Sequence, residues 1–167
     1  MLFVTPPDVL VGESGRLMAV RGGDGALTVS TRRGARFDRE TWLRRAGQDA
    51  AELWPKQGVS LDGRMVCDFY GCIFRKDATT VALVRRREAL FEDCWTADVV
   101  ISAVPVRQAC DGPALVIGLD DLQRSGAHAL HIEAGRVRVE SVDDRRGDRP
   151  WVVRPPEHRR RAAAPKT

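Results

Sequence analysis

The sequence predicts a single domain of mixed α/β or α+β class, a layered sheet structure with a few short helices. Strand-sized runs rich in β-branched and apolar residues outnumber helical stretches by roughly two to one. Residues 99–104 form an apolar run without alternation, the pattern of a strand covered on both faces. Residues 97–142 are expected to run strand, loop, strand, short helix, strand, turn, strand. A chain of 167 residues is long enough for one domain with a real core, which we place at residues 1–151.

The first third of the chain is expected to open with a three-strand meander that leads into a helix. The predicted strands cover residues 8–11, 16–21 and 26–30, and a glycine-rich hairpin-type turn separates the last two. The helix is expected at residues 37–47, with Asp38 as its cap and Glu40 near its positive end. Trp42 and Leu43 should face inward.

The remainder is expected to contain further strands, a closing hairpin and two short helices. Residues 48–62 have an irregular pattern broken by proline and glycine. The expected strands are residues 64–67, 72–75, 79–84, 99–104 and 115–117. The expected helices are residues 86–93 and 120–125, and the hairpin pairs residues 128–132 with residues 136–142. Residues 143–148 mix charges and are expected to form a solvated loop.

Arginine dominates the net charge of +4, and its distribution along the chain is uneven. Residues 152–167 are rich in Pro, Ala and Arg with little to bury, so we expect a disordered basic tail. Arg159, Arg160 and Arg161 could contact the phosphates of nucleic acid or an anionic lipid surface. The alternative is a solvated tail with only non-specific affinity, because the tail lacks interleaved aromatic residues.

Membrane insertion is not expected of this chain taken alone. Its longest apolar run, residues 97–106, is strand-sized, whereas a spanning helix needs about 20 apolar residues. The first residues have no basic region and no apolar core followed by a cleavage site, so they do not resemble a signal peptide. The chain alone is therefore expected to be soluble, whatever larger protein it belongs to.

The four cysteines allow three interpretations. Cys67 and Cys72 bracket a short predicted hairpin loop, which would place them opposite each other and within reach of a disulfide. Cys94 and Cys110 flank the apolar strand and form the second candidate pair. Two disulfides would imply an oxidising compartment. A zinc site is the second interpretation, although the spacing is loose, and four reduced thiols that behave as small hydrophobes are the third.

Motifs for catalysis are missing from the sequence. The three histidines are His128, His131 and His158, and the first two should point to opposite faces of one strand. No histidine-rich metal motif, no G-x-S-x-G nucleophile motif and no phosphate-binding P-loop occurs. Asp120 and Asp121 could pair as carboxylates, but Asp at the start of a short helix more often caps it. We therefore predict no metal, no cofactor and no small-molecule substrate.

Several segments, in this order and spacing, resemble one known family. They are PDVLVGESGRLMAVRGGDGAL, WLRR, MVCDFYGCIFR, EDCWTADVVISAVPVRQAC, SGAHALHI and RGDRPW. Together they cover nearly all of residues 7–151 and resemble the C-terminal soluble domain of ComEC-type competence proteins. These are the inner-membrane DNA-uptake channels of bacteria, and the resemblance is to the variant form of alphaproteobacteria. The resemblance implies a metallo-β-lactamase-like fold.

The chain departs from the commoner members of that family at the metal site. Their strand corresponding to residues 97–102 is followed by a His-His-Gly element that binds metal and phosphate. This chain has Ala103-Val-Pro-Val-Arg107 there, and the upstream histidine cluster is absent. The resemblance therefore implies a degenerate domain that keeps the architecture and is not expected to act as a nuclease.

The function that follows is that of a non-catalytic accessory domain of an inner-membrane DNA-uptake channel. Its expected partners are the channel portion of the parent protein and single-stranded DNA, bound weakly and without sequence preference. Besides the tail, the candidate DNA contacts are Arg32, Arg33, Arg36, Arg44 and Arg45, which fit an ordinary exposed face equally well. Two alternatives stay open: a phosphodiesterase or nuclease fragment whose metal ligands lie upstream, and an unrelated disulfide-stapled binding module.

Overall fold

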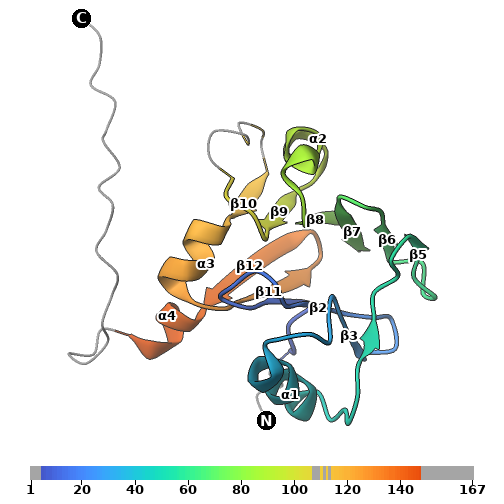
Figure 1. The fold of residues 1–167 in the computed structure, drawn as a ribbon, viewed down its shortest axis with the longest axis vertical. Helices are drawn as coiled ribbons and strands as arrows, with labels where there is room; N and C mark the ends of the chain where they lie inside the picture. The colour runs from blue at the N-terminus through green and yellow to red at the C-terminus, as the bar shows by residue number, and fades with distance from the viewer. Residues whose placement is uncertain (1–4, 107–109, 111, 113, 148–167) are drawn as a thin grey trace, which may run out of the picture.

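Two six-stranded sheets face each other at the centre of the protein (Figure 1). The structure is a computed structural model that describes residues 5–106, 110, 112 and 114–147. Helices lie on the outer faces of both sheets, so the layers follow one another as helix, sheet, sheet and helix. The predicted mixed class, with several strands and a few short helices, is confirmed.

Sheet A is formed by the first strands of the chain together with the closing hairpin. Its order is β12 (Arg136–Ser141), β11 (His128–Glu133), β1 (Val9–Val11), β2 (Met18–Arg21), β3 (Leu27–Val29) and β4 (Glu52–Leu53). All neighbours are antiparallel except β3 and β4. The expected opening meander and closing hairpin are therefore both present, and the hairpin pairs directly with the first strand.

Sheet B contains the middle of the chain. Its order is β10 (Leu115–Ile117), β9 (Val99–Ser102), β8 (Thr79–Val84), β7 (Gly71–Lys76), β6 (Met65–Cys67) and β5 (Gly58–Val59). The first three strands in this order are parallel, and the others are antiparallel to their neighbours. β9 is buried along its whole length, as its unbroken apolar run predicts.

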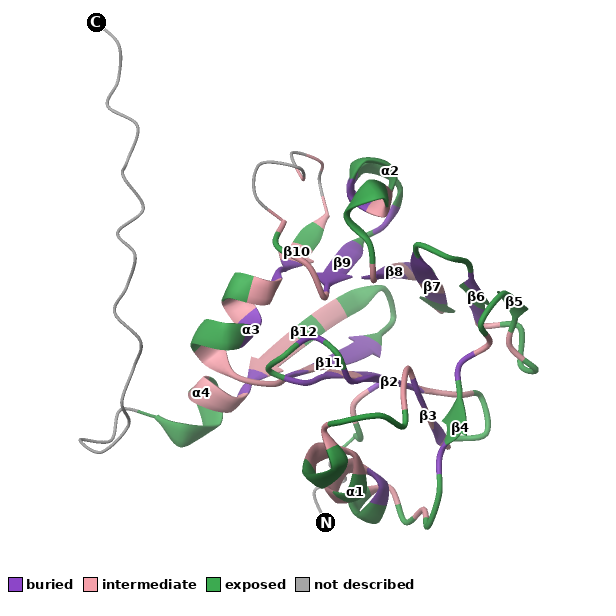
Figure 2. Cartoon of the chain, in the orientation of Figure 1, coloured by how far each residue is buried: buried purple, intermediate pink, exposed green. Residues whose placement is uncertain are grey.

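The main hydrophobic core lies between the sheets. Alternation along β1 turns Val9 and Val11 inward, where they are fully buried. Phe74 and Leu83 of sheet B meet them from the other side, also fully buried. Figure 2 shows the buried positions concentrated on the strands, with exposed residues on the helices and turns.

Each sheet has a second, outward face that is partly covered by a helix. α1 (Arg36–Arg45) packs Leu43 and Trp42 against the outer face of sheet A, as predicted. The one-turn helix η1 (Arg87–Ala89) leads into α2 (Leu90–Thr96), which buries Leu90 and Cys94 against sheet B. α3 (Leu119–Ser125) and α4 (Val142–Arg146) contact each other beside the closing hairpin.

Three expectations from the sequence are wrong in detail. Of the residues 143–148 expected as a loop, residues 143–146 belong to α4, which starts at Val142 and is capped reciprocally by Ser141 and Asp144. Asp38 is not the cap of α1, which begins at Arg36 and has no side-chain cap. The irregular segment 48–62 contributes two short strands, β4 and β5, one to each sheet.

None of the described helices combines the length and apolar character that crossing a bilayer requires.

Candidate nucleic-acid interface

A basic groove lies at the edge of sheet B where parallel strands end. Because β8 and β9 run in the same direction, the residues that follow them meet at one edge of the sheet. The groove has a volume of about 620 Å³. We call it the arginine groove, and its lining residues are Lys56, Asp68, Phe69, Arg85, Arg86, Arg87, Glu88 and Val104.

The tight turn between β6 and β7 forms one wall of the groove. Asp68 shapes this turn, since its Oδ1 accepts hydrogen bonds from the N–H groups of Tyr70 (2.7 Å) and Gly71 (2.9 Å). The backbone N–H groups of Arg85 and Arg86 both donate to the Tyr70 carbonyl, at 2.9 and 3.0 Å. The turn is therefore fastened to the end of β8, and the aromatic and arginine side chains are brought together.

Aromatic rings hold two of the arginines in place. The Arg86 guanidinium lies 3.7 Å from the centroid of the Phe69 ring, within cation–π distance. Arg85 lies 5.8 Å from the Trp54 ring and donates a 3.7 Å hydrogen bond to Cys72 Sγ. Burial lowers the pKa of Arg85 from its ordinary value, and the carboxylate of Asp68 opposes that shift. Arg85 is thus a half-buried support of the groove, and Arg86 is its exposed neighbour.

The groove carries excess positive charge that is accessible to a ligand. Four cations line it against the two carboxylates of Asp68 and Glu88. Arg86 and Arg87 are exposed, and no carboxylate among the described residues forms an ion pair with either of them. Phe69 is also exposed, at 59%. Cations beside an exposed ring suit a phosphate backbone with a stacked base.

The arginines predicted from sequence lie elsewhere. The turn before α1 and α1 itself carry Arg32, Arg33, Arg36, Arg44 and Arg45, beyond the outer face of sheet A. Two of them have local partners, because Arg36 pairs with Glu40 at 2.6 Å and Arg32 donates to the Ala51 carbonyl at 2.9 Å. None of the five lines the arginine groove. Arg159, Arg160 and Arg161 lie outside the described residues.

Sequence reasoning missed the run Arg85-Arg86-Arg87. It assigned Arg86 and the residues after it to a short helix, and it gave no strand order from which the edge of a sheet could be located. The available signal was an arginine run directly after the strand at residues 79–84, whose last four residues are apolar, in a chain where the run at residues 99–104 was expected to be covered on both faces. Such a run must emerge at the carboxyl end of the sheet.

The cysteines are paired in the structure. Cys67 and Cys72 are direct cross-strand partners on β6 and β7, joined by a disulfide with a Cα–Cα distance of 4.0 Å. Cys94 of α2 is joined to Cys110 with a Cα–Cα distance of 5.3 Å. The first pair lies beside the groove, since Cys72 accepts the hydrogen bond from Arg85.

His128 and His131 lie on β11, and His158 lies outside the described residues. His128 shares the inward parity of Leu130 and Ile132 on β11, whereas His131 lies on the opposite face. Across the described part of the chain, no three side chains of His, Cys, Asp or Glu come together where they could hold a metal ion. After β9, Ala103 packs against the main core and Val104 lines the groove, and neither side chain can bind a metal.

Comparison with family models, with curated proteins and with solved structures finds no match to this chain.

Proposed function

We propose that this chain is a non-catalytic accessory domain of an inner-membrane DNA-uptake channel, and that its arginine groove binds single-stranded DNA. Its fold would be a degenerate metallo-β-lactamase-like one. The order of helix, sheet, sheet and helix supports that assignment, as does the resemblance of residues 7–151 to ComEC-type domains. Binding would be weak and blind to sequence, because the groove offers charge and an aromatic ring but few groups that could read base edges.

One observation carries the proposal: two exposed arginines that pair with no carboxylate in the described part of the chain lie beside an exposed phenylalanine where parallel strands end. Open α/β sheets bind their ligands outside the carboxyl ends of the strands. In this domain that position has Arg86, Arg87 and Phe69 in place of catalytic groups. Under this proposal, the groove corresponds to the region of the metal site in the family that the chain resembles, with phosphate contact in place of metal coordination.

The loop after β9 supports the non-catalytic part of the proposal. Ala103, Val104 and Pro105 stand at the position of the His-His-Gly element, and their side chains can neither bind a metal nor transfer a proton. Ser102 is fully buried, and its hydroxyl donates to the Val104 carbonyl at 2.6 Å, which holds the turn. The loop thus has a structural explanation that needs no reaction.

The test is the salt dependence of DNA binding. Fluorescence anisotropy of a labelled single-stranded oligonucleotide is measured at several salt concentrations for the wild-type chain and for the double variant Arg86→Gln/Arg87→Gln. The logarithm of the affinity should fall by about 0.7 per log unit of salt for each phosphate contacted. The double variant should lower this slope by up to about 1.4 if each arginine contacts one phosphate.

A matched variant separates the groove from bulk charge. Arg33→Gln/Arg44→Gln removes the same charge from exposed positions on the α1 side and should leave the slope almost unchanged. An equal reduction of the salt-dependence slope in both double variants would reject the groove as the binding site. A chain that lacks residues 154–167 measures the contribution of the basic tail, and affinity that depends on base sequence would contradict the proposal.

The parent protein and the compartment form a separate part of the proposal. Disulfides form and persist mainly in oxidising environments, and for a bacterial inner-membrane protein the two bonds therefore favour the periplasmic side. The upstream reading frame tests the parentage, since a channel would contribute about ten apolar segments of roughly 20 residues each. An upstream frame that encodes a histidine-rich metal motif would instead favour the phosphodiesterase alternative.

A further inference from the structure

A second pocket lies on the outer face of sheet A, away from the arginine groove. α1 covers the part of this face formed by β1, β2 and β3, and the part over β11 and β12 is left open between α1 and α4. The pocket has a volume of about 280 Å³. That is roughly twice the 150 Å³ of a cavity that holds benzene, so a one-ring or two-ring molecule fits.

The walls of this pocket are apolar and include an aromatic side chain. Leu10 of β1 and Leu27 of β3 contribute from the sheet, and Trp42 contributes from α1. Pro6 and Pro7 close another side. Rigid aliphatic and aromatic walls of this kind suit a flat, apolar ligand body.

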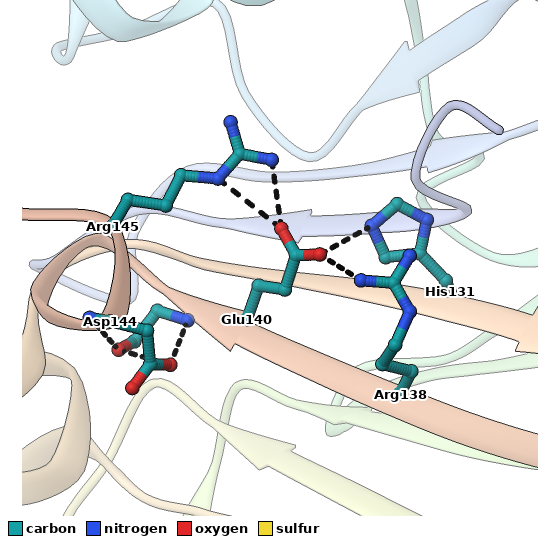
Figure 3. A network of polar contacts seen from close by, with 6 residues as sticks. His131, Arg138, Glu140, Asp144 and Arg145 are labelled. Carbon is teal, nitrogen blue, oxygen red and sulfur yellow. Dashed lines mark hydrogen bonds and ion pairs between the residues drawn. The ribbon is translucent and has the colours of Figure 1, made fainter. Parts of the chain in front are cut away.

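His131 is the polar group of the pocket whose ring nitrogens have no hydrogen-bond partner among the described residues. Its side chain is 5% exposed, and neither ring nitrogen has a hydrogen-bond partner among the described residues. Nε2 lies 3.9 Å from Glu140 Oε1, which is too far for a hydrogen bond; the dashed line between them in Figure 3 marks a charge contact that needs a protonated ring. A buried imidazole normally satisfies at least one nitrogen, so this ring, which lines the pocket, keeps a hydrogen-bonding capacity that a bound molecule can use once the atoms covering the nitrogens shift.

The charges around the pocket favour an anion. Glu140 is the acidic residue that lines it, and this carboxylate is already held by Arg138 and Arg145 (Figure 3). Arg45 also lines the pocket and has no ion-pair partner among the described residues. Arg21 donates its hydrogen bonds to the carbonyls of Pro7 and Gly25. Positive charge at the rim therefore exceeds the negative charge.

We propose that this pocket binds a small organic anion with a flat aromatic body and a carboxylate or phosphate head. The body lies between Trp42 and the leucines of the sheet, the imidazole of His131 hydrogen-bonds the ligand, and the head is held by the rim arginines. Burial and the nearby Arg138 lower the pKa of His131, so the ring is neutral at pH 7 and offers one donor and one acceptor. This site is independent of DNA binding in the arginine groove.

The test uses the full chain labelled at its histidine rings and two probes, 2-naphthoate and phenyl phosphate. NMR spectra should show a saturable shift of the His131 resonances, assigned with the variant His131→Gln. The His128 resonances should shift with them, because His128 also lines the pocket. Arg45→Gln should weaken binding severalfold. Arg44→Gln is the matched control, because Arg44 is the exposed neighbour that does not line the pocket. The stronger of the two probes identifies the head group.

Three results would overturn the proposal. The first is the absence of any saturable His131 shift with either probe. The second is equal binding of the cation 2-naphthylmethylamine, which would show that the rim charge selects nothing. The third is binding only to a chain that starts at Thr5, which would show that residues 1–4 occupy the pocket in the intact protein.

Discussion

The two sheets gather charged side chains in different ways. In sheet B, parallel β8 and β9 end at the same edge, and the arginine groove forms there from loop residues. In sheet A, the neighbours β11 and β12 are antiparallel, and their charged residues meet on a face. His131 and Arg138 are direct cross-strand partners, and Glu140 lies diagonally across from His131. Strand direction therefore decides whether an edge or a face becomes polar.

The two clusters also differ in how far their charges are satisfied internally. Glu140 lies in contact with both Arg138 and Arg145, so most of the charge on the face of sheet A is used within the fold. Arg86 and Arg87 at the edge of sheet B have no such carboxylate partner in the described structure. An internally paired cluster stabilises a fold, whereas unpaired cations at an open edge are available to a polyanion.

The largest expected effect comes from cutting the ion pair that joins the two sheets. Lys76 of β7 lies 2.7 Å from Asp8, and the other Asp8 oxygen accepts the buried N–H of Ile132 at 2.7 Å. Asp8→Ala leaves the Lys76 cation and the Ile132 N–H without this partner and should lower the free energy of unfolding by about 3 kcal/mol. Urea unfolding followed by circular dichroism measures the loss.

Two further variants of this pair sharpen the comparison of the sheets. Asp8→Asn keeps an acceptor for Ile132 and should cost less than Asp8→Ala, and Lys76→Met should cost least, because Asp8 keeps its backbone donor. All three variants should unfold in one transition, since the sheets share one core. Two separate transitions would show that the sheets are independent units.

The second effect distinguishes the two disulfides, both of which belong to the sheet B half. The Cys94–Cys110 bond closes a span of 16 residues in the sequence and the Cys67–Cys72 bond a span of 5. In the chain-entropy model these loops correspond to about 3 and about 2 kcal/mol. The two disulfides are each replaced by a pair of serines, and the variants are expressed in the periplasm and unfolded in urea. The Cys94→Ser/Cys110→Ser variant should lose more unfolding free energy than the Cys67→Ser/Cys72→Ser variant. Free thiols in non-reducing peptide maps of the wild-type protein would refute the pairing.

The sequence located most of the strands because their signals are local. Val9 and Val11 alternate with Leu10, and residues 79–84 are rich in β-branched residues, so strand-forming pattern and burial agree. α4 was missed because its sequence, Val-Asp-Asp-Arg-Arg, has no apolar periodicity. It forms through the capping box of Ser141 and Asp144, a signal of two residues three positions apart.

The candidate site was harder to predict because it depends on strand order. Phe69 and Arg86 are 17 positions apart in the sequence and meet only because β7 and β8 pair as a hairpin that brings the β6–β7 turn to the end of β8. The arginines chosen from sequence were those in visible clusters. A cluster in sequence shows charge density, whereas a binding edge requires the register of the sheet.

The third effect concerns the aromatic part of the groove. Phe69→Ala should weaken binding of single-stranded DNA by about 1–2 kcal/mol, because it removes a stacking surface and the support of Arg86. Fluorescence titration at constant salt measures the change. Phe91→Ala, at an exposed position of α2 that does not line the groove, is the control and should change the affinity little. A larger loss in the control would move the interface from the edge to the helix.

The smallest effect concerns the pH dependence of stability, which should have opposite signs for one residue beside sheet B and one on sheet A. Burial, with help from Glu92 and Asp68, raises the pKa of Asp93 beside sheet B to about 6. The folded state then binds an extra proton, and this group makes stability fall as pH rises from about 4 to 6. Asp93→Asn should therefore raise the free energy of unfolding by about 1 kcal/mol at pH 7.5, allowing for solvent screening, and should change it almost not at all at pH 4.

His131 on sheet A should act with the opposite sign. Burial and then Arg138 lower the pKa of this ring, so the folded state resists protonation. The unfolded state binds more protons just below its ordinary pKa of about 6.5, and stability therefore falls as pH decreases through that value. His131→Gln should flatten this limb of the pH–stability curve and leave the Asp93 limb intact. Both variants are unfolded in urea at several pH values from 4 to 8. The assignment is contradicted if Asp93→Asn changes the pH dependence assigned to His131, or if His131→Gln changes the one assigned to Asp93, because the two groups belong to different sheets.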